Sequence, residues 1–118
     1  TAVLAKTPPA NSLPTTVSRA AGLALTKAMS KDLGQYNIRV NAVCIGLIRS
    51  DQIEKRWKDQ EPDLSWDEYS RKVGETIPLG RIGDTEEAAN AITFLASQAA
   101  SYVTGTAVNI DGGSGEAL

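Results

Sequence analysis

Only two segments of this 118-residue chain have the pattern of a buried β-strand, and helical segments separate them. The first runs from Asn37 to Ile45, where polar and apolar residues alternate before an apolar end, and the second runs from Thr106 to Ile110. Strands separated by helices pair in parallel through right-handed crossovers. Two parallel strands leave the faces and edges of a sheet uncovered, so we expect further strands from an upstream half or a partner chain to complete it.

The two clearest helical segments precede these strands. The run from Thr15 to Leu33 repeats apolar residues at helical spacing, with Pro14 before it and Gly34 as the expected C-terminal cap. Its many small side chains predict close packing on more than one side. A second helix is expected to begin at Asp84, with Glu87 completing a capping box. The apolar face of this second helix comprises Ala88, Ala91, Ile92 and Leu95.

A charged excursion, residues 49–75, separates the first strand from the second helix and carries both tryptophans of the chain. Two short helices are predicted within it, over Asp51–Asp59 and over Ser65–Val73, and the second opens with a capping pattern. After the last strand, the glycine-rich Asp111–Gly115 segment is expected to be flexible.

Composition excludes several classes of function. A formal charge of −2 with scattered basic residues gives no footprint for nucleic acid or an anionic membrane, and no apolar stretch reaches the roughly 20 residues of a membrane span. One cysteine and no histidine exclude an internal disulfide, a His/Cys metal cluster and a Ser-His-Asp arrangement within the chain. Cys44 is expected to be a buried, inert thiol. Without a signal-peptide pattern, a cytoplasmic location is expected.

Several motifs occur together in a characteristic order. They are the helix Arg19–Ala28, the strand Ile38–Val43, the loop Ile77–Gly83, the turn Ser101–Gly105 and the terminal Asn109–Gly113. In this order and spacing they resemble the short-chain dehydrogenase/reductase family over essentially the whole chain.

The resemblance implies an α/β fold with a doubly wound, Rossmann-like parallel sheet that binds NAD or NADP at the carboxyl ends of its strands. The phosphate-binding glycine loop of that family lies near its N-terminus, and no G-x-G-x-x-G sequence occurs here. Residues 1–118 are therefore expected to be the C-terminal portion of a single domain, with 49–75 as its substrate loop or lid. The opening residues, Thr1–Ala5, fit a strand entered midway. The family also implies a homo-oligomer, a dimer or tetramer formed through the first helix and the final strand.

The residues that the family uses for proton transfer are all replaced. A tyrosine, a lysine one helical turn later and an upstream serine correspond here to Thr15, Arg19 and Ala2. A threonine hydroxyl is a far weaker acid than a phenol, whose reference pKa is about 10. Arg19 keeps a positive charge that can hold a ribose or phosphate, but its planar guanidinium is not interchangeable with an ammonium. Ala2 offers no side-chain donor for a substrate carbonyl.

The segment Ile45–Ser50 resembles the family turn that binds the nicotinamide carboxamide. Gly46 and Ile48 match this turn, Ser50 keeps a hydroxyl where the family has threonine, and Ile45 replaces its proline. Backbone contacts depend little on side chains, so this half of a cofactor site is expected to be retained. The alternative is a tight turn that binds no ligand.

Two functions remain open. The first is an NAD(P)-dependent oxidoreductase that acts on a small-molecule carbonyl or alcohol, with the proton relayed by Thr15 and a water, or by Tyr69 of the excursion. The second is a catalytically silent relative that serves as a binding or structural subunit, as the substitutions at Ala2, Thr15 and Arg19 indicate. In either case the 118 residues alone are expected to be inactive.

Overall fold

The computed structural model describes residues 2–117. Its elements follow one another in the order predicted from the sequence, with short 3-10 turns between them. The helices and strands are α1 (Thr15–Leu33), β1 (Ala42–Ile45), α2 (Asp51–Gln60), α3 (Trp66–Val73), α4 (Thr85–Ala96) and β2 (Ala107–Ile110), and the 3-10 turns are η1 (Val3–Ala5), η2 (Gly34–Tyr36), η3 (Gly74–Thr76) and η4 (Gln98–Ala100).

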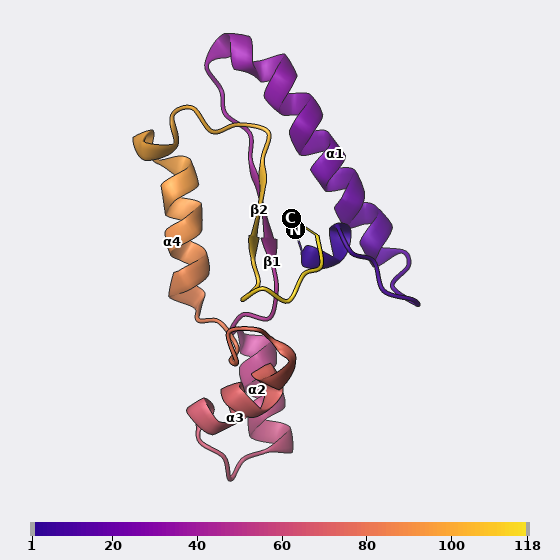
Figure 1. Cartoon of the computed structure of the whole chain (residues 1–118), viewed down its shortest axis with the longest axis vertical. Helices are drawn as coiled ribbons and strands as arrows, with labels where there is room; N and C mark the ends of the chain where they lie inside the picture. Colours follow the sequence, from indigo (N-terminus) through magenta and orange to yellow (C-terminus); the bar gives the residue numbers. More distant parts are fainter. Residues whose placement is uncertain (1, 118) are drawn as a thin grey trace.

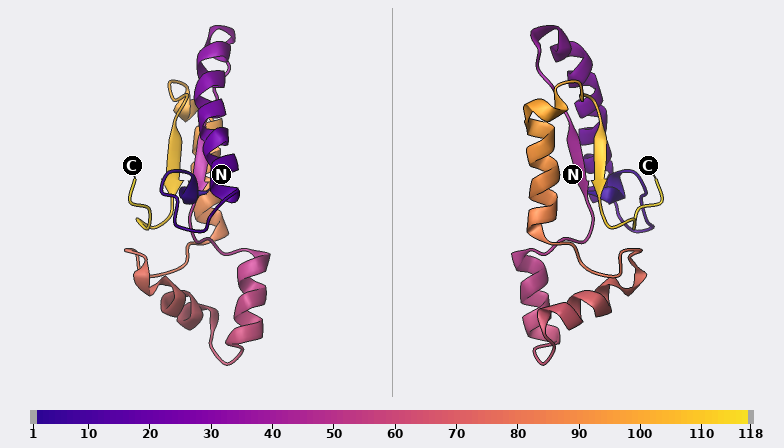
Figure 2. Two further views of the ribbon diagram at one scale, coloured as in Figure 1. Left: turned by 90° about the vertical axis from the view of Figure 1, so that its right-hand side faces the viewer. Right: turned by 60° about the vertical axis from the view of Figure 1, so that its left-hand side comes forward.

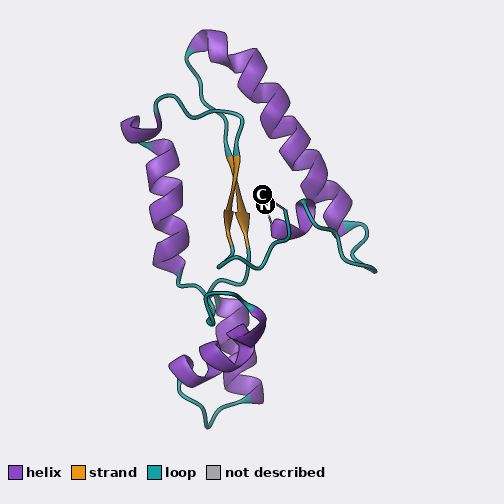
Figure 3. Ribbon diagram, in the orientation of Figure 1, coloured by secondary structure: helices purple, strands orange, loops and turns teal. Residues whose placement is uncertain are grey.

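The two strands form the predicted parallel pair, with Ala42 opposite Ala107 and Ile45 opposite Ile110. On its other edge β1 makes an isolated parallel bridge to Ala2, so β1 lies between two neighbours. Seen edge-on, the sheet has α4 on one face and α1 on the other, while α2 and α3 lie beyond the carboxyl ends of the strands (Figures 1 and 3). This is the arrangement of a partial α/β fold.

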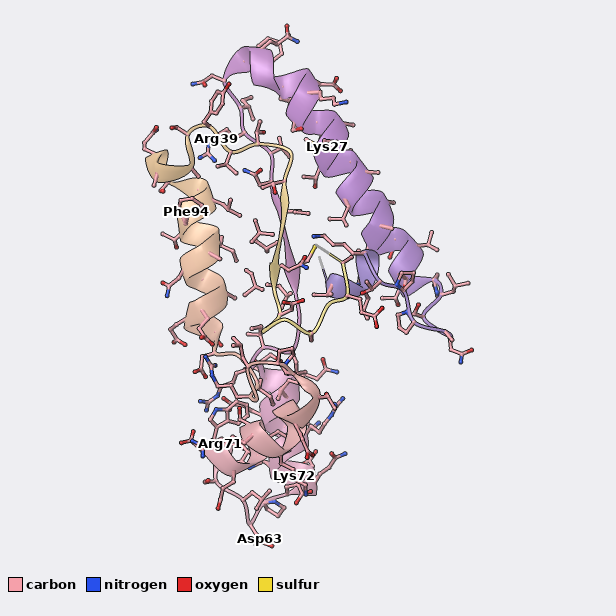
Figure 4. All side chains as sticks on the ribbon, viewed as in Figure 1. Lys27, Arg39, Asp63, Arg71, Lys72 and Phe94 are labelled. Carbon is pink, nitrogen blue, oxygen red and sulfur yellow. The ribbon has the colours of Figure 1, made fainter. Side chains whose placement is uncertain are left out.

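The first strand is shorter than predicted. Residues 37–41 were expected to belong to it, but only one backbone bond continues the ladder there, from the Gly105 amide to the Val40 carbonyl at 2.7 Å. Polar side chains make the other bonds: the Val40 amide donates to Thr104 Oγ1 at 3.0 Å, and Asn41 Nδ2 donates to the Val103 carbonyl at 2.9 Å. Arg39 leaves the sheet altogether and donates to four backbone carbonyls, three of them at the end of α4. Figure 4 shows Arg39 beside that end of the helix.

One expectation about α1 is wrong. Among its residues only Thr16 and Ser30 are buried, whereas Val17 and Leu25 are 59% and 58% exposed, so the helix is not packed on more than one side. Its main contacts with the rest of the described chain are with η1 and η2. In addition, Lys27 Nζ donates a hydrogen bond to the Gly105 carbonyl at 2.8 Å. Gly34 is the C-cap of the helix, as predicted, with a right-handed φ of −58°, and the left-handed residue that follows is Asn37, with φ of 59°.

The molecule is more extended than a self-contained domain of its size. Its radius of gyration is 16.2 Å, against about 13–14 Å for a compact chain of this length. Its accessible surface is 7892 Å², against about 6,200 Å² for a folded monomer of the same mass. Figure 2 shows the thin, elongated shape that results. The described chain is therefore less compact than a folded monomer of its mass.

Burial concentrates at the junction of the strands with the excursion. The two largest fully buried side chains, Cys44 and Ile82, lie there, and Ala100 of η4 is also fully buried. Cys44 is the buried thiol that the sequence predicts. None of the helices formed by residues 2–117 is long and apolar enough to cross a membrane.

Candidate functional site

The carboxyl ends of β1 and β2 are joined at Gly46. Its amide donates to the Ile110 carbonyl at 2.9 Å, which extends the ladder by one residue. A side chain at this position would not fit, because a Cβ on Gly46 would lie 2.6 Å from the Cβ of Asp111. The glycine therefore allows the turn to start directly against the end of the neighbouring strand.

Beyond Gly46 the turn is held from a second side by the loop that precedes α4. Ile48 and Gly83 form a parallel bridge, in which the Gly83 amide donates to the Leu47 carbonyl at 3.1 Å and the Arg49 amide donates to the Gly83 carbonyl at 2.8 Å. In such a bridge the N–H and C=O of the central residue point away from the partner. The backbone amide and carbonyl of Ile48 consequently face outward from Gly83.

The hydroxyl of Ser50 forms the N-cap of α2. Its oxygen accepts a hydrogen bond from the Ile53 amide at 3.4 Å. A hydroxyl that accepts through its oxygen still has its own proton to donate. The turn thus presents a backbone donor, a backbone acceptor and a hydroxyl proton within three residues.

The segment after β2 is ordered by its own aspartate, contrary to the flexibility expected from its glycines. The Asp111 carboxylate accepts from the amides of Gly113 and Gly115, at 3.0 and 2.9 Å. Gly112 and Gly113 have φ values of 63° and 87°, which side-chain-bearing residues rarely adopt. Together with the turn and the loop at residues 78–83, this segment lines a hollow of about 480 Å³ whose walls are largely apolar.

One ion pair at this hollow organises the start of α4. Both terminal nitrogens of Arg81 donate to the Glu87 carboxylate, at 2.8 and 2.6 Å, and the Asp84 amide donates to the same carboxylate at 2.7 Å. These bonds, with that of Arg81 the largest, lower the pKa of Glu87 to about 2, and the carboxylate in turn raises the pKa of Arg81. The capping box predicted from Asp84 and Glu87 is present.

The three positions predicted for proton transfer lie around this end of the sheet. Ala2 bridges Ile45 at the carboxyl end of β1, directly beside the turn. Thr15 and Arg19 are exposed on the first turns of α1, a helix that contacts η1 just after Ala2. The start of α1 lies at the same end of the molecule as the carboxyl ends of the strands (Figure 1). The structure thus brings Ala2 to the turn and leaves Thr15 and Arg19 facing open space.

Comparison with known proteins identifies this arrangement. A family model described as Enoyl-(Acyl carrier protein) reductase matches residues 2–115. The chain belongs to the short-chain dehydrogenase/reductase family. An uncharacterized oxidoreductase from Thermotoga maritima is 43% identical over 99 residues, which are 83% of this chain and 38% of that protein.

Solved structures of this family superpose closely on the chain. A short chain oxidoreductase from Pseudomonas aeruginosa PAO1 containing an atypical catalytic center has a TM-score of 0.92 at 33% identity, over 99% of this chain and 46% of that one. Its NADPH-bound form has a TM-score of 0.88 at 32% identity. L-sorbose reductase from Gluconobacter frateurii, complexed with NADPH and L-sorbose, has a TM-score of 0.84 at 32% identity, over 99% and 46%. The chain spans less than half the length of these short-chain dehydrogenase/reductase members.

Tyr69 does not have the setting of a proton donor. It is only 3% exposed and packs in a cluster with Ile53 and Ile82, with its ring centroid 6.3 Å from that of Trp57 and 6.0 Å from that of Trp66. Both tryptophans pack in this cluster. This burial argues against the alternative in which Tyr69 replaces the missing phenol.

Two contributors to the site were missed from the sequence. Arg49 contacts both helices of the excursion: its Nε donates to Glu54 Oε1 at 2.7 Å, and its guanidinium lies 4.4 Å from the ring centroid of Trp66. Lys6 Nζ donates to Asn109 Oδ1 at 2.7 Å and so ties the segment after Ala2 to β2. Neither shows a local sequence signal, because each partner is distant in the chain or identifiable only in three dimensions.

Proposed function

We propose that this chain is the nicotinamide-binding and substrate-lid portion of an NAD(P)-dependent oxidoreductase that transfers hydride to or from a small-molecule carbonyl or alcohol. Family membership supports the reaction class, and the NADPH-bound structures that superpose on the chain support the cofactor. The observation that carries the proposal is the turn at residues 45–50, whose exposed polar groups suit the nicotinamide carboxamide.

The fit rests on complementary hydrogen bonding. A carboxamide carries one carbonyl acceptor and one NH₂ donor, and Ile48 offers an amide and a carbonyl that point away from Gly83. The Ser50 hydroxyl adds a proton donor beside them. Ile45 and Gly46 complete the turn and hold its backbone against β2. When bound, the nicotinamide supplies or accepts the hydride; the chain orients it, and the excursion excludes water above it.

Proton transfer in this proposal passes through a hydroxyl and water rather than a phenol. Thr15 donates its hydroxyl proton to the alkoxide that forms as hydride reaches the carbonyl carbon, and it recovers a proton from a water molecule. Arg19, one turn further along α1, holds the ribose or phosphate and stabilises the negative charge. Ala2 contributes no hydrogen bond. The P. aeruginosa relative, which contains an atypical catalytic center, is a precedent within the family for an altered centre.

We further propose that the full-length enzyme is cytoplasmic and assembles as a dimer or tetramer of identical subunits. The exposed apolar residues of α1, such as Val17 and Leu25, and the surface in excess of a compact monomer support a covered state for this part of the chain. Size-exclusion chromatography with light scattering on the full-length protein measures the assembly, and a monomer would contradict this part.

The test is a titration of the full-length protein with NADH and with NADPH, followed by turnover of a panel of carbonyls and alcohols. We expect saturable binding of one dinucleotide. Thr15→Val should keep that binding and lower kcat about 100-fold or more, because loss of a general acid costs this much. Thr93→Val, at an exposed threonine of α4 far along the sheet from the turn, is the matched control and should leave both unchanged.

A catalytically silent binding or structural subunit is the second candidate, favoured by the replacement of all three proton-transfer residues at Ala2, Thr15 and Arg19. Bound dinucleotide without turnover across the panel would support it over the enzyme. Turnover by the unmodified protein that falls on Thr15→Val would exclude it.

A further inference from the structure

Arg49 connects the turn at residues 45–50 to the helices α2 and α3 of the excursion. It lies between Ile48 and Ser50, the two residues whose polar groups we assign to the carboxamide. Its side chain, in contrast, reaches away from the turn into the excursion. No motif of the sequence singles it out, and the function proposed above gives it no role.

The backbone of Arg49 is fixed to the start of α4. Its amide donates to the Gly83 carbonyl at 2.8 Å, and its carbonyl accepts from Thr85 Oγ1 at 3.0 Å. The turn at this residue therefore cannot shift without breaking a bond to the loop or to the helix.

The side chain of Arg49 joins the two helices of the excursion. Its Nε donates to Glu54 on α2 at 2.7 Å, and its guanidinium stacks 4.4 Å from the ring centroid of Trp66 on α3. The bond to Arg49 is the largest cause that lowers the pKa of Glu54, so the carboxylate is charged at neutral pH and retains its partner. A guanidinium over an indole face is attracted by the ring quadrupole.

Trp66 in turn belongs to the aromatic cluster that holds the excursion together. Its ring centroid lies 5.6 Å from that of Trp57 and 6.0 Å from that of Tyr69. Leu47 of the turn and Ile82 of the adjoining loop pack into the same cluster. The turn and the excursion are thus one packed body, to which Arg49 adds an ion pair with α2 and a cation–π contact with α3.

We infer that Arg49 is a positioning residue that couples occupancy of the nicotinamide turn to the position of the lid. A dinucleotide that fixes Ile48 and Ser50 also fixes the residue between them, and through it Glu54 and Trp66. Because coupling between two sites is reciprocal, a lid held in place by Arg49 also raises the affinity of the turn for the dinucleotide. This inference rests on the proposed function.

The test follows Trp66 while dinucleotide binds. The full-length protein is labelled with 5-fluorotryptophan, and Trp66→Phe assigns the ¹⁹F resonance of Trp66. We expect addition of NADPH, or of NADH if that is the dinucleotide bound, to shift this resonance. In Arg49→Met the dinucleotide should still bind, about fivefold or more weakly, while the Trp66 resonance no longer responds.

Arg56→Met is the matched control, since it removes the same charge from an exposed position of α2 without touching the turn or Trp66. It should behave as the unmodified protein does. Arg49→Lys retains the charge and the contact with Glu54, so it keeps the fold if the methionine variant loses it, and its Trp66 response should be intermediate.

The outcomes separate the two claims. If Arg49→Met or Arg49→Lys binds dinucleotide with an undiminished Trp66 shift, the coupling is overturned while the proposed function stands. If the unmodified protein binds neither NADH nor NADPH, the proposed function fails and the coupling fails with it.

Discussion

At the scale of single residues, the turn depends on a neighbour more than on its own backbone angles. Gly46 is needed because Asp111 occupies the space that a Cβ would fill, at 2.6 Å. The same aspartate orders the glycines that follow it by accepting from two of their amides. One side chain at the end of β2 thereby shapes both the turn and the rim of the hollow beside it.

Gly46→Ala should displace the turn from β2 and lower dinucleotide affinity at least tenfold, with a loss of stability of about 1–3 kcal/mol from overpacking. Isothermal titration and urea unfolding of the full-length protein measure these effects. Gly22→Ala is the control: apart from the backbone of its own helix and its chain neighbours, no described atom lies within 4 Å of the added Cβ, and alanine should stabilise α1 by about 0.5–1 kcal/mol. Equal behaviour of the two variants would show that Asp111 yields to the methyl group.

Arg39 caps the C-terminal end of α4, although it lies more than 50 residues before that end in the sequence. It donates to the carbonyls of Leu95, Ala96 and Ser97, which a helix end leaves without internal partners, and to that of Val103. Arg39→Met should therefore lower the free energy of unfolding by about 2 kcal/mol or more. Urea unfolding beside Arg56→Met checks this, since the control should change stability by less than about 0.5 kcal/mol.

At the scale of elements, the start of α4 carries a pH-dependent contribution. The pKa of Glu87 is about 2 in the folded protein and near 4.5 when unfolded, so the folded state binds fewer protons between these values. The contribution is complete above pH 4.5 or so and is lost as the pH falls toward 2. Because the side chain is 44% exposed, it should amount to less than about 1 kcal/mol.

Glu87→Gln should consequently be less stable than the unmodified protein at pH 7, and the difference should shrink as the pH is lowered to 3. Urea unfolding of both proteins at these two values measures the change. A difference that is constant with pH would assign the effect to packing instead of to the charge.

The excursion uses Tyr69 for its ring and not for its hydroxyl. Tyr69→Phe should leave kcat within about threefold, whereas removing a true general acid lowers it about 100-fold or more. Tyr69→Ala should cost about 3 kcal/mol, because it empties the centre of the aromatic cluster. Steady-state kinetics and urea unfolding distinguish the two effects, and loss of turnover in the phenylalanine variant would restore Tyr69 as a proton donor.

The elements that local patterns can define were predicted well from the sequence. The bounds of α1 and the capping residues Ser65 and Asp84 are as expected, because helical periodicity and caps involve only neighbouring residues. The left-handed Asn37 was not, although it closes a local turn by donating its amide to the Gly34 carbonyl. The length of β1 was not either, since polar bonds to distant residues decide it. The same reason hides Arg49 and the contact of Gly46 with Asp111 from any reading of the chain alone.

At the scale of the whole molecule, the accessible surface area and the radius of gyration both exceed those of a compact monomer of this size. About 1,700 Å² more surface is accessible than a folded monomer of this mass exposes. The exposed apolar side chains of α1 form part of this excess. Within residues 2–117, Ala2 alone bridges the outer edge of β1, so the sheet is open along most of that edge as well.

Residues 1–118 produced alone should accordingly fail to form a compact monomer. We expect aggregation or fast hydrogen exchange throughout α1, because the helix has few tertiary contacts to protect its amides. Light scattering with amide hydrogen exchange measures both. A monodisperse monomer with a protected α1 would contradict the argument from surface area.

The hydrogen bond between the Gly46 amide and the Ile110 carbonyl joins two residues that are synthesised at different times. A ribosome adds about 5–20 residues per second, so the turn emerges several seconds before the strand that closes it. During that interval the apolar end of β1, with the thiol of Cys44, has no partner on the β2 side. The nascent chain therefore exposes this unpaired strand edge for several seconds, and any slowing of translation over residues 97–110 lengthens that exposure.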